Sequence, residues 1–137
     1  MSAKSNYALE NQDKALTDFR KLATEVTTRE GAESKYRVAE ILFAMGDIEE
    51  AEALVYEFVD QNTPHQYWMA RMFILLSDIS IIQEDEFQAR ATLQSLADYY
   101  QIDDDGIMDE VRAKLAELNL NNEVANDTIK LSIKKNN

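Results

Sequence analysis

The chain has 137 residues, of which three are glycine, one is proline and none is cysteine, and its net charge is −12. Four turn-forming residues are too few for a multi-stranded sheet, and a hydrophobic content of 45% excludes disorder over most of the chain. The composition therefore predicts an all-α protein of one domain, or a piece of a larger one. Without thiols it has no disulfide, no cysteine-ligated zinc and no cysteine nucleophile.

Turn-forming or acidic residues divide the chain into six segments. The boundaries fall at Gly31, Gly46, Pro64, residues 84–86 and residues 103–106. Between these boundaries apolar residues recur three or four positions apart, which places them on one face of a helix. The apolar stripes of the first, second, third, fifth and sixth segments begin at Ala15, Ala32, Ile48, Ala89 and Ile107.

The fourth segment, residues 67–82, is apolar on almost every side instead of along one stripe. A helix without a polar face has to be enclosed by neighbouring helices. We therefore expect this helix to be the central element of the fold. Thr63, Pro64 and Gln66 predict its start, because they match an N-cap, a first helical residue and the second half of a capping box.

Acidic residues are concentrated in the middle of the chain. Residues 38–110 contain 17 acids and only two bases, Arg71 and Arg90, whereas the two ends together hold nine acids and 12 bases. Such a field repels nucleic-acid phosphates and anionic membranes, so a basic protein or peptide is the favoured partner. Many of these carboxylates also fall at predicted helix starts, where they face the positive end of the helix dipole. The alternative is that the acidity serves only solubility and helix capping.

The sequence contains no apolar run that is long enough to cross a bilayer. The most apolar stretch, residues 67–82, includes Arg71 and Asp78. The first 30 residues are polar and charged, without an apolar stretch of the signal-peptide type. We therefore expect no membrane insertion.

An internal repeat relates the second and third segments to the fourth and fifth. A shift of 38 residues places Asp47 on Asp85 and Ala51 on Ala89, and a shift of 36 places Ala15 on Ala51. A period of 36–38 residues that contains two helices is typical of a solenoid of stacked helical hairpins.

Residues 38–58 resemble a tetratricopeptide repeat (TPR). They have the small Ala39 within the first helix, a Gly46-Asp47 turn, Ala51 early in the second helix and Val55 four residues later. Residues 68–100 follow the pattern less closely, since their turn has no glycine. The resemblance implies a right-handed α-α superhelix, here of about six helices with a C-terminal capping helix.

Residues 31–36 and 62–71 resemble, more narrowly, the last repeats of large exported TPR proteins of Bacteroidetes-type bacteria. If the chain is a fragment of such a protein, the resemblance implies a periplasmic or exported location, and a cytoplasmic location is the alternative. The expected organisation is a helical domain over residues 1–118 and a frayed, flexible tail over 119–137. The units within the domain are a half-repeat at 7–30, repeats at 32–62 and 64–100, and the capping helix at 105–118.

The sequence offers no constellation for catalysis or metal binding. His65 is the single histidine, so neither a hydrolase triad nor an imidazole metal site can be assembled, and we expect it at a helix cap or rim. The acidic run 103–106 invites comparison with a calcium loop, but Gln101 and Arg112 stand where an EF-hand needs Asp and Glu. We therefore expect no cofactor and no enzymatic activity.

Protein binding remains as the expected function. TPR proteins typically hold a peptide or protein on the concave face lined by the first helices of the repeats, which implies an interaction scaffold with an acidic and apolar face. The lysines and asparagines with which some TPR domains clamp a terminal carboxylate are absent from the equivalent positions, so we reject that mode. By the repeat register, the exposed positions on this face are Tyr36, Glu40, Phe43, Ile74, Asp78 and Ile81.

Two alternatives to a peptide-binding face stay open. Glu40 and Asp78 can instead satisfy local partners such as Arg37 or Arg71. The chain can also be the structural terminal repeats of a longer scaffold, with no ligand of its own. Trp68 is of a type common in binding hot spots, but it lies on the enclosed helix, which favours a core role.

Overall fold

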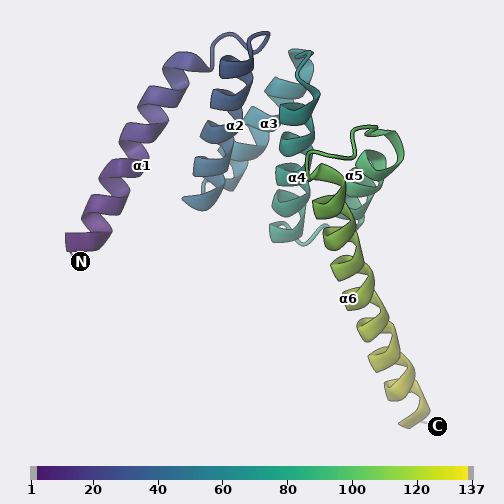
Figure 1. Cartoon of the computed structure of the whole chain (residues 1–137). Helices are drawn as coiled ribbons and strands as arrows, with labels where there is room; N and C mark the ends of the chain where they lie inside the picture. The colour runs from purple at the N-terminus through teal and green to yellow at the C-terminus, as the bar shows by residue number, and fades with distance from the viewer. Residues whose placement is uncertain (1–2, 136–137) are drawn as a thin grey trace.

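The computed structural model describes residues 3–135, and in that range the chain forms six helices and no strand. The all-α prediction is therefore confirmed. Each helix lies beside the next one along the chain, and α6 runs past the end of the other helices (Figure 1). In chain order the helices are α1 (Ala3–Leu22), α2 (Arg29–Ala44), α3 (Ile48–Asp60), α4 (Gln66–Ile82), α5 (Glu86–Tyr99) and α6 (Ile107–Lys135).

Helix α4 is the centre of the packing, as its apolar sequence predicts. It contacts α2, α3, α5 and α6, and it contributes side chains to two hydrophobic cores. Trp68, Met72 and Ile79 belong to the core shared with α1, α2 and α3. Ala70 and Ile74 belong to the core shared with α5 and α6. Different sides of one helix thus join the two halves of the molecule. Each large apolar side chain that is fully buried contributes about 1.5–3 kcal/mol to the free energy of unfolding.

The turns after α2 and α4 share one backbone geometry, 38 residues apart. Gly46 has a φ of +86° and Glu84 a φ of +62°. In both turns this residue donates to the carbonyl three positions back and its successor donates to the carbonyl five positions back, which defines a Schellman helix end. The donor–acceptor pairs are Gly46–Phe43 and Glu84–Ile81, both at 3.0 Å, Asp47–Leu42 at 2.9 Å and Asp85–Ser80 at 2.8 Å.

The start of α4 differs from the prediction that Thr63 caps it. The hydroxyl of Thr63 instead donates to the carbonyl of Val26 at 2.6 Å and accepts from the N–H of His65 at 3.3 Å. His65 occupies the N-cap position without a side-chain capping bond, and its Nε2–H donates to the carbonyl of Thr27 at 2.8 Å. Both side chains therefore tie the loop before α4 to the loop before α2.

Two helix boundaries are corrected by the structure. Gly31 lies in the first turn of α2, because Thr28 caps this helix by accepting from the N–H of Gly31 at 3.0 Å. The capping helix does not end at residue 118 but continues to Lys135, since no glycine or proline follows Gly106 to interrupt it. Residues 1–2 of the expected domain and 136–137 of the expected tail lie outside the described residues.

Glu84→Gly is expected to raise the free energy of unfolding by about 1 kcal/mol, because glycine adopts a positive φ without the penalty of a Cβ. The measurement is urea unfolding followed by circular dichroism. Glu84→Gln is the matched control, since it removes the same charge and keeps the Cβ. Equal stability of the two variants would contradict the strain at Glu84.

Gly31→Ala is expected to lower the free energy of unfolding by about 2 kcal/mol or more. A Cβ at this position would lie 1.7 Å from the carbonyl oxygen of Glu25, so the loop before α2 would have to move. The same change inside an unobstructed helix stabilises by about 0.5–1 kcal/mol. A thermal melt that shows an unchanged or higher midpoint would therefore refute this close approach.

Candidate binding surface

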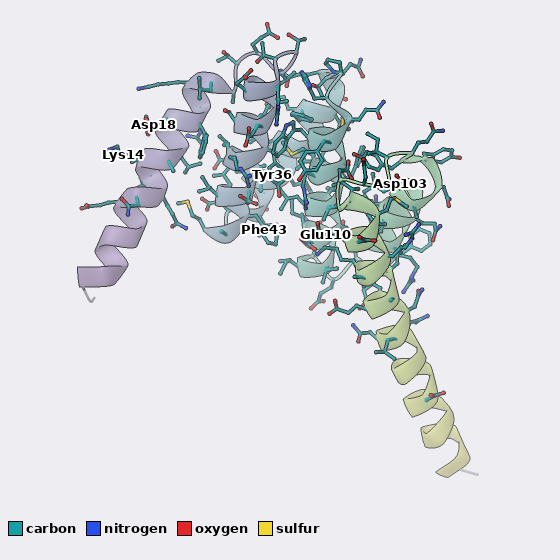
Figure 2. All side chains as sticks on the ribbon, viewed as in Figure 1. Lys14, Asp18, Tyr36, Phe43, Asp103 and Glu110 are labelled. Carbon is teal, nitrogen blue, oxygen red and sulfur yellow. The ribbon has the colours of Figure 1, made fainter. Side chains whose placement is uncertain are left out.

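Helix α6 covers much of the predicted binding face on α4. Ile74 is buried in the core that α4 forms with α5 and α6. Asp78 pairs with Lys114 of α6 at 2.9 Å, and Arg71 pairs with Glu110, which Figure 2 labels on the same helix. Asp78 therefore has a charged partner, as the local-partner alternative proposed, but that partner comes from α6 and is not Arg71.

The predicted positions on α2 are also engaged locally. Tyr36 lies against Trp68 with ring centroids 5.6 Å apart, and its hydroxyl donates to Glu40 at 3.1 Å. Burial and the adjacent Glu40 carboxylate raise the pKa of Tyr36. Glu40 also accepts from Arg37 at 3.0 Å, which is the local pairing that the alternative described. Phe43, at the end of α2, is half-buried.

The predicted set therefore does not form one exposed surface. Tyr36 and Ile74 are only 8% and 4% exposed, so their expected exposure is wrong, because α4 covers the first and α5 and α6 cover the second. Ile81, near the end of α4, keeps 40% of its surface exposed. Glu40 remains partly exposed beside its local partners.

Two grooves lie elsewhere, between odd-numbered helices whose backbones do not meet in the described part of the chain. The first groove lies between α1 and α3, has α2 as its floor and has a volume of about 420 Å³. The second groove lies between α3 and α5, has α4 as its floor and has a volume of about 580 Å³.

The two grooves are equivalent sites within the repeat. A shift of 38 residues maps six lining positions of the first groove onto six of the second, and a shift of 36 maps Arg20 onto Tyr56. The six pairs are Lys35 and Phe73, Val38 and Leu76, Glu50 and Gln88, Leu54 and Thr92, Glu57 and Ser95, and Gln61 and Tyr99.

Charged side chains bridge the walls and floor of the first groove. Arg20 of α1 pairs with Glu50 of α3 at 3.1 Å. Lys35 projects from the floor, and its Nζ donates to Glu57 at 2.8 Å and to Gln61 at 2.6 Å. The side chain of Lys35 is only 4% exposed, so these contacts hold a buried ammonium in place.

The second groove has none of these charges among its fourteen lining residues. Phe73 replaces the buried lysine and, with Met69, forms a half-buried apolar floor. Tyr56 and Tyr99 stand on the two walls and are 48% and 82% exposed. Binding sites are commonly concave and mostly apolar, and tyrosine is enriched among the residues that contribute most to binding energy.

Sequence reasoning missed this groove, although a signal for it was present. The repeat register aligns Lys35 with Phe73 and Glu57 with Ser95, so it shows where the second repeat loses charge. The register alone does not show that the backbones of α3 and α5 stay apart, and that separation is what opens the groove.

No family model, curated protein or solved structure matches the chain. Within residues 3–135, none of the helices combines the length and apolarity that a membrane crossing requires. In the same range no three His, Cys, Asp or Glu side chains gather to hold a metal ion. The function of the protein is therefore inferred from the geometry of its surface.

Lys35→Met is expected to change the free energy of unfolding by less than about 1 kcal/mol, whereas Glu57→Ala is expected to cost about 2 kcal/mol. Methionine removes the buried ammonium and leaves Glu57, which is 61% exposed, in contact with water. Loss of Glu57 leaves that ammonium with Gln61 as its remaining partner among the described bonds. Urea unfolding of both variants checks the order, and the reverse order would contradict this assignment.

Proposed function

We propose that this chain is a protein-interaction module, built as a short TPR-like solenoid, that holds an apolar segment of a partner protein in the second groove. The repeated Schellman turns and the contacts of α4 with α2 and α6 support a stack of helical hairpins. The proposed site differs from the concave face expected from the resemblance. On that face Ile74 is buried in the core formed with α5 and α6, and Asp78 is paired with Lys114 of α6.

The observation that carries this proposal is the contrast between two equivalent grooves. One is bridged by Arg20–Glu50 and Lys35–Glu57, and the other is lined only by uncharged side chains and has exposed tyrosines on its walls. Tyr56 and Tyr99 expose large aromatic side chains on opposite walls of one concave apolar surface, and a partner seated between them would cover both.

Binding is favoured over catalysis by the chemistry of the groove. Its lining contains hydroxyls, such as those of Thr92 and Ser95, but no histidine, carboxylate, lysine or cysteine that could activate them. We therefore propose a non-enzymatic role that needs no cofactor.

A second candidate function is that of the terminal repeats of a longer scaffold. The placement of α6 favours it, because this helix covers one end of the stack and pairs with Arg71 and Asp78, as a capping helix would. The two candidate functions are compatible, since a terminal repeat can carry a binding groove.

Selection from a random 16-residue peptide library is expected to yield ligands whose binding Ser95→Arg weakens about tenfold or more. Ser95 lines the groove and is exposed, so arginine there blocks the site without disturbing the core. Gln94→Arg is the matched control and is expected to leave affinity unchanged. It adds the same charge to α5 at a position outside the groove lining, next to Asp98, which Gln94 contacts at 2.9 Å.

Fluorescence anisotropy measures these affinities, and NMR shift mapping locates the bound peptide. A library without binders, or binders that tolerate Ser95→Arg, would refute the proposed site. Shifts centred on Glu40, Phe43 and Ile81 would return the binding function to the face that the resemblance implies.

A further inference from the structure

We infer, on the basis of the proposed function, that the partner segment is an amphipathic α-helix of about three turns with Lys or Arg beside its apolar face. Three features of the second groove lead to this class of partner: its length, the scarcity of free hydrogen-bonding groups on its floor, and the charge of the two helices that form its walls.

The length of the groove fits a short helix. On α5 the lining runs from Gln88 to Tyr99, and on α4 it runs from Gln66 to Leu76. At 1.5 Å per residue these stretches are about 15–17 Å long, which an 11-residue helix matches with about three turns. The small side chains Ala91 and Ser95 on the α5 wall leave room for side chains that project from such a helix.

The floor of the groove favours a segment that satisfies its own backbone. Met69, Phe73 and Leu76 offer no partner to a peptide N–H or carbonyl, and a buried backbone group without a hydrogen bond is costly. An α-helix makes these bonds internally, whereas an extended strand needs an outside partner. Residues 3–135 form no strand, so they offer no sheet edge that such a segment could join.

Several polar groups around the groove are already engaged. Thr63 donates to the carbonyl of Val26, and Gln88 donates to the hydroxyl of Thr92 at 3.3 Å. These bonds leave fewer groups to hold an extended backbone, which again favours a helix.

The walls of the groove are acidic just outside its uncharged lining. Helix α3 carries no base, and two of its five acids, Glu50 and Glu57, line the first groove, where Arg20 and Lys35 pair with them. Helix α5 carries two acids and Arg90, which is not part of the lining. Glu52 and Asp60 lie four residues before and after Tyr56, so the three side chains share one side of α3. Glu52 also accepts from Gln83 at 2.9 Å, which places it where α3 meets the turn between α4 and α5. Lysine or arginine beside the apolar face of the partner would meet these carboxylates.

Three peptide libraries with a fixed pattern test the class of partner. The first repeats apolar residues at helical spacing with Lys or Arg beside them, and the second keeps that spacing with Asp or Glu instead. The third keeps Lys and Arg but alternates apolar and polar residues, as in a strand. Each library is selected on the unchanged protein, and in each round the peptides that also bind the Ser95→Arg variant are removed. Only the first library is expected to yield enriched peptides. Enrichment of the second or third library would overturn the inference.

This result separates the two levels of the proposal. If the random library yields binders that Ser95→Arg blocks, while the helical basic library yields none, the groove is a binding site but its partner class is wrong. If neither library yields such binders, both the site and the partner class are refuted.

Charge reversal on the protein tests the same contacts. Asp60→Lys is expected to lower the affinity for the enriched helical peptide about three- to tenfold at low salt. The loss is expected to become smaller at higher salt, which screens the charges. Asp18→Lys, on the outer helix α1, is the matched control with the same change in net charge and is expected to have no effect (Figure 2). Equal affinities of the two variants would overturn the acidic-wall contact.

Sedimentation velocity of the free protein distinguishes an outside partner from a second copy of the chain. A single monomeric species at the concentrations used for binding supports a separate partner. A dimer that Ser95→Arg dissociates would assign the groove to a second copy and overturn the inference.

Discussion

Helix α4 has no polar face, and the rest of the fold is arranged to enclose it. Helices α2 and α3 cover one side, through the core that contains Trp68 and Ile79, and α5 and α6 cover another, through the core that contains Ile74. The enclosure is incomplete along the strip of Met69 and Phe73, which stays half-buried between α3 and α5. The same apolar helix therefore organises the core and supplies the floor of the second groove.

The repeat conserves backbone geometry more strictly than side-chain chemistry. Glu84 adopts the positive φ that Gly46 adopts one period earlier, because the packing of the following helix fixes the turn and outweighs the steric cost of a Cβ. The side chains at equivalent positions of the two grooves differ. The first groove has the buried Lys35 paired with Glu57, and 38 residues later the second has Phe73 and Ser95. One scaffold thus carries a groove bridged by charge and a groove that is open and apolar.

Helix α6 forms ion pairs with α4 that neutralise part of the negative charge in the middle of the chain. Glu110 and Asp78 are paired with Arg71 and Lys114 across the α4–α6 contact, so the face lined by α4 is largely neutralised there. In contrast, α3 has no base of its own. Its Glu50 and Glu57 are paired with Arg20 and Lys35 in the first groove, so Glu52 and Asp60 are the α3 carboxylates beside the second groove that a basic segment would meet.

The sequence by itself determined that residues 3–135 form six helices, roughly where most of them lie, and the central place of α4, because these depend on the local spacing of apolar residues. The start of α5 is also set locally, since Asp85 caps this helix by accepting from the N–H of Gln88 at 3.0 Å, three residues away. Only the tertiary structure decided that Thr63 bonds the carbonyl of Val26, that Ile74 is covered by α5 and α6, and that Asp78 pairs with Lys114. A local pattern shows which face of a helix is apolar or charged, but the packing of distant segments decides what covers that face and where a groove remains.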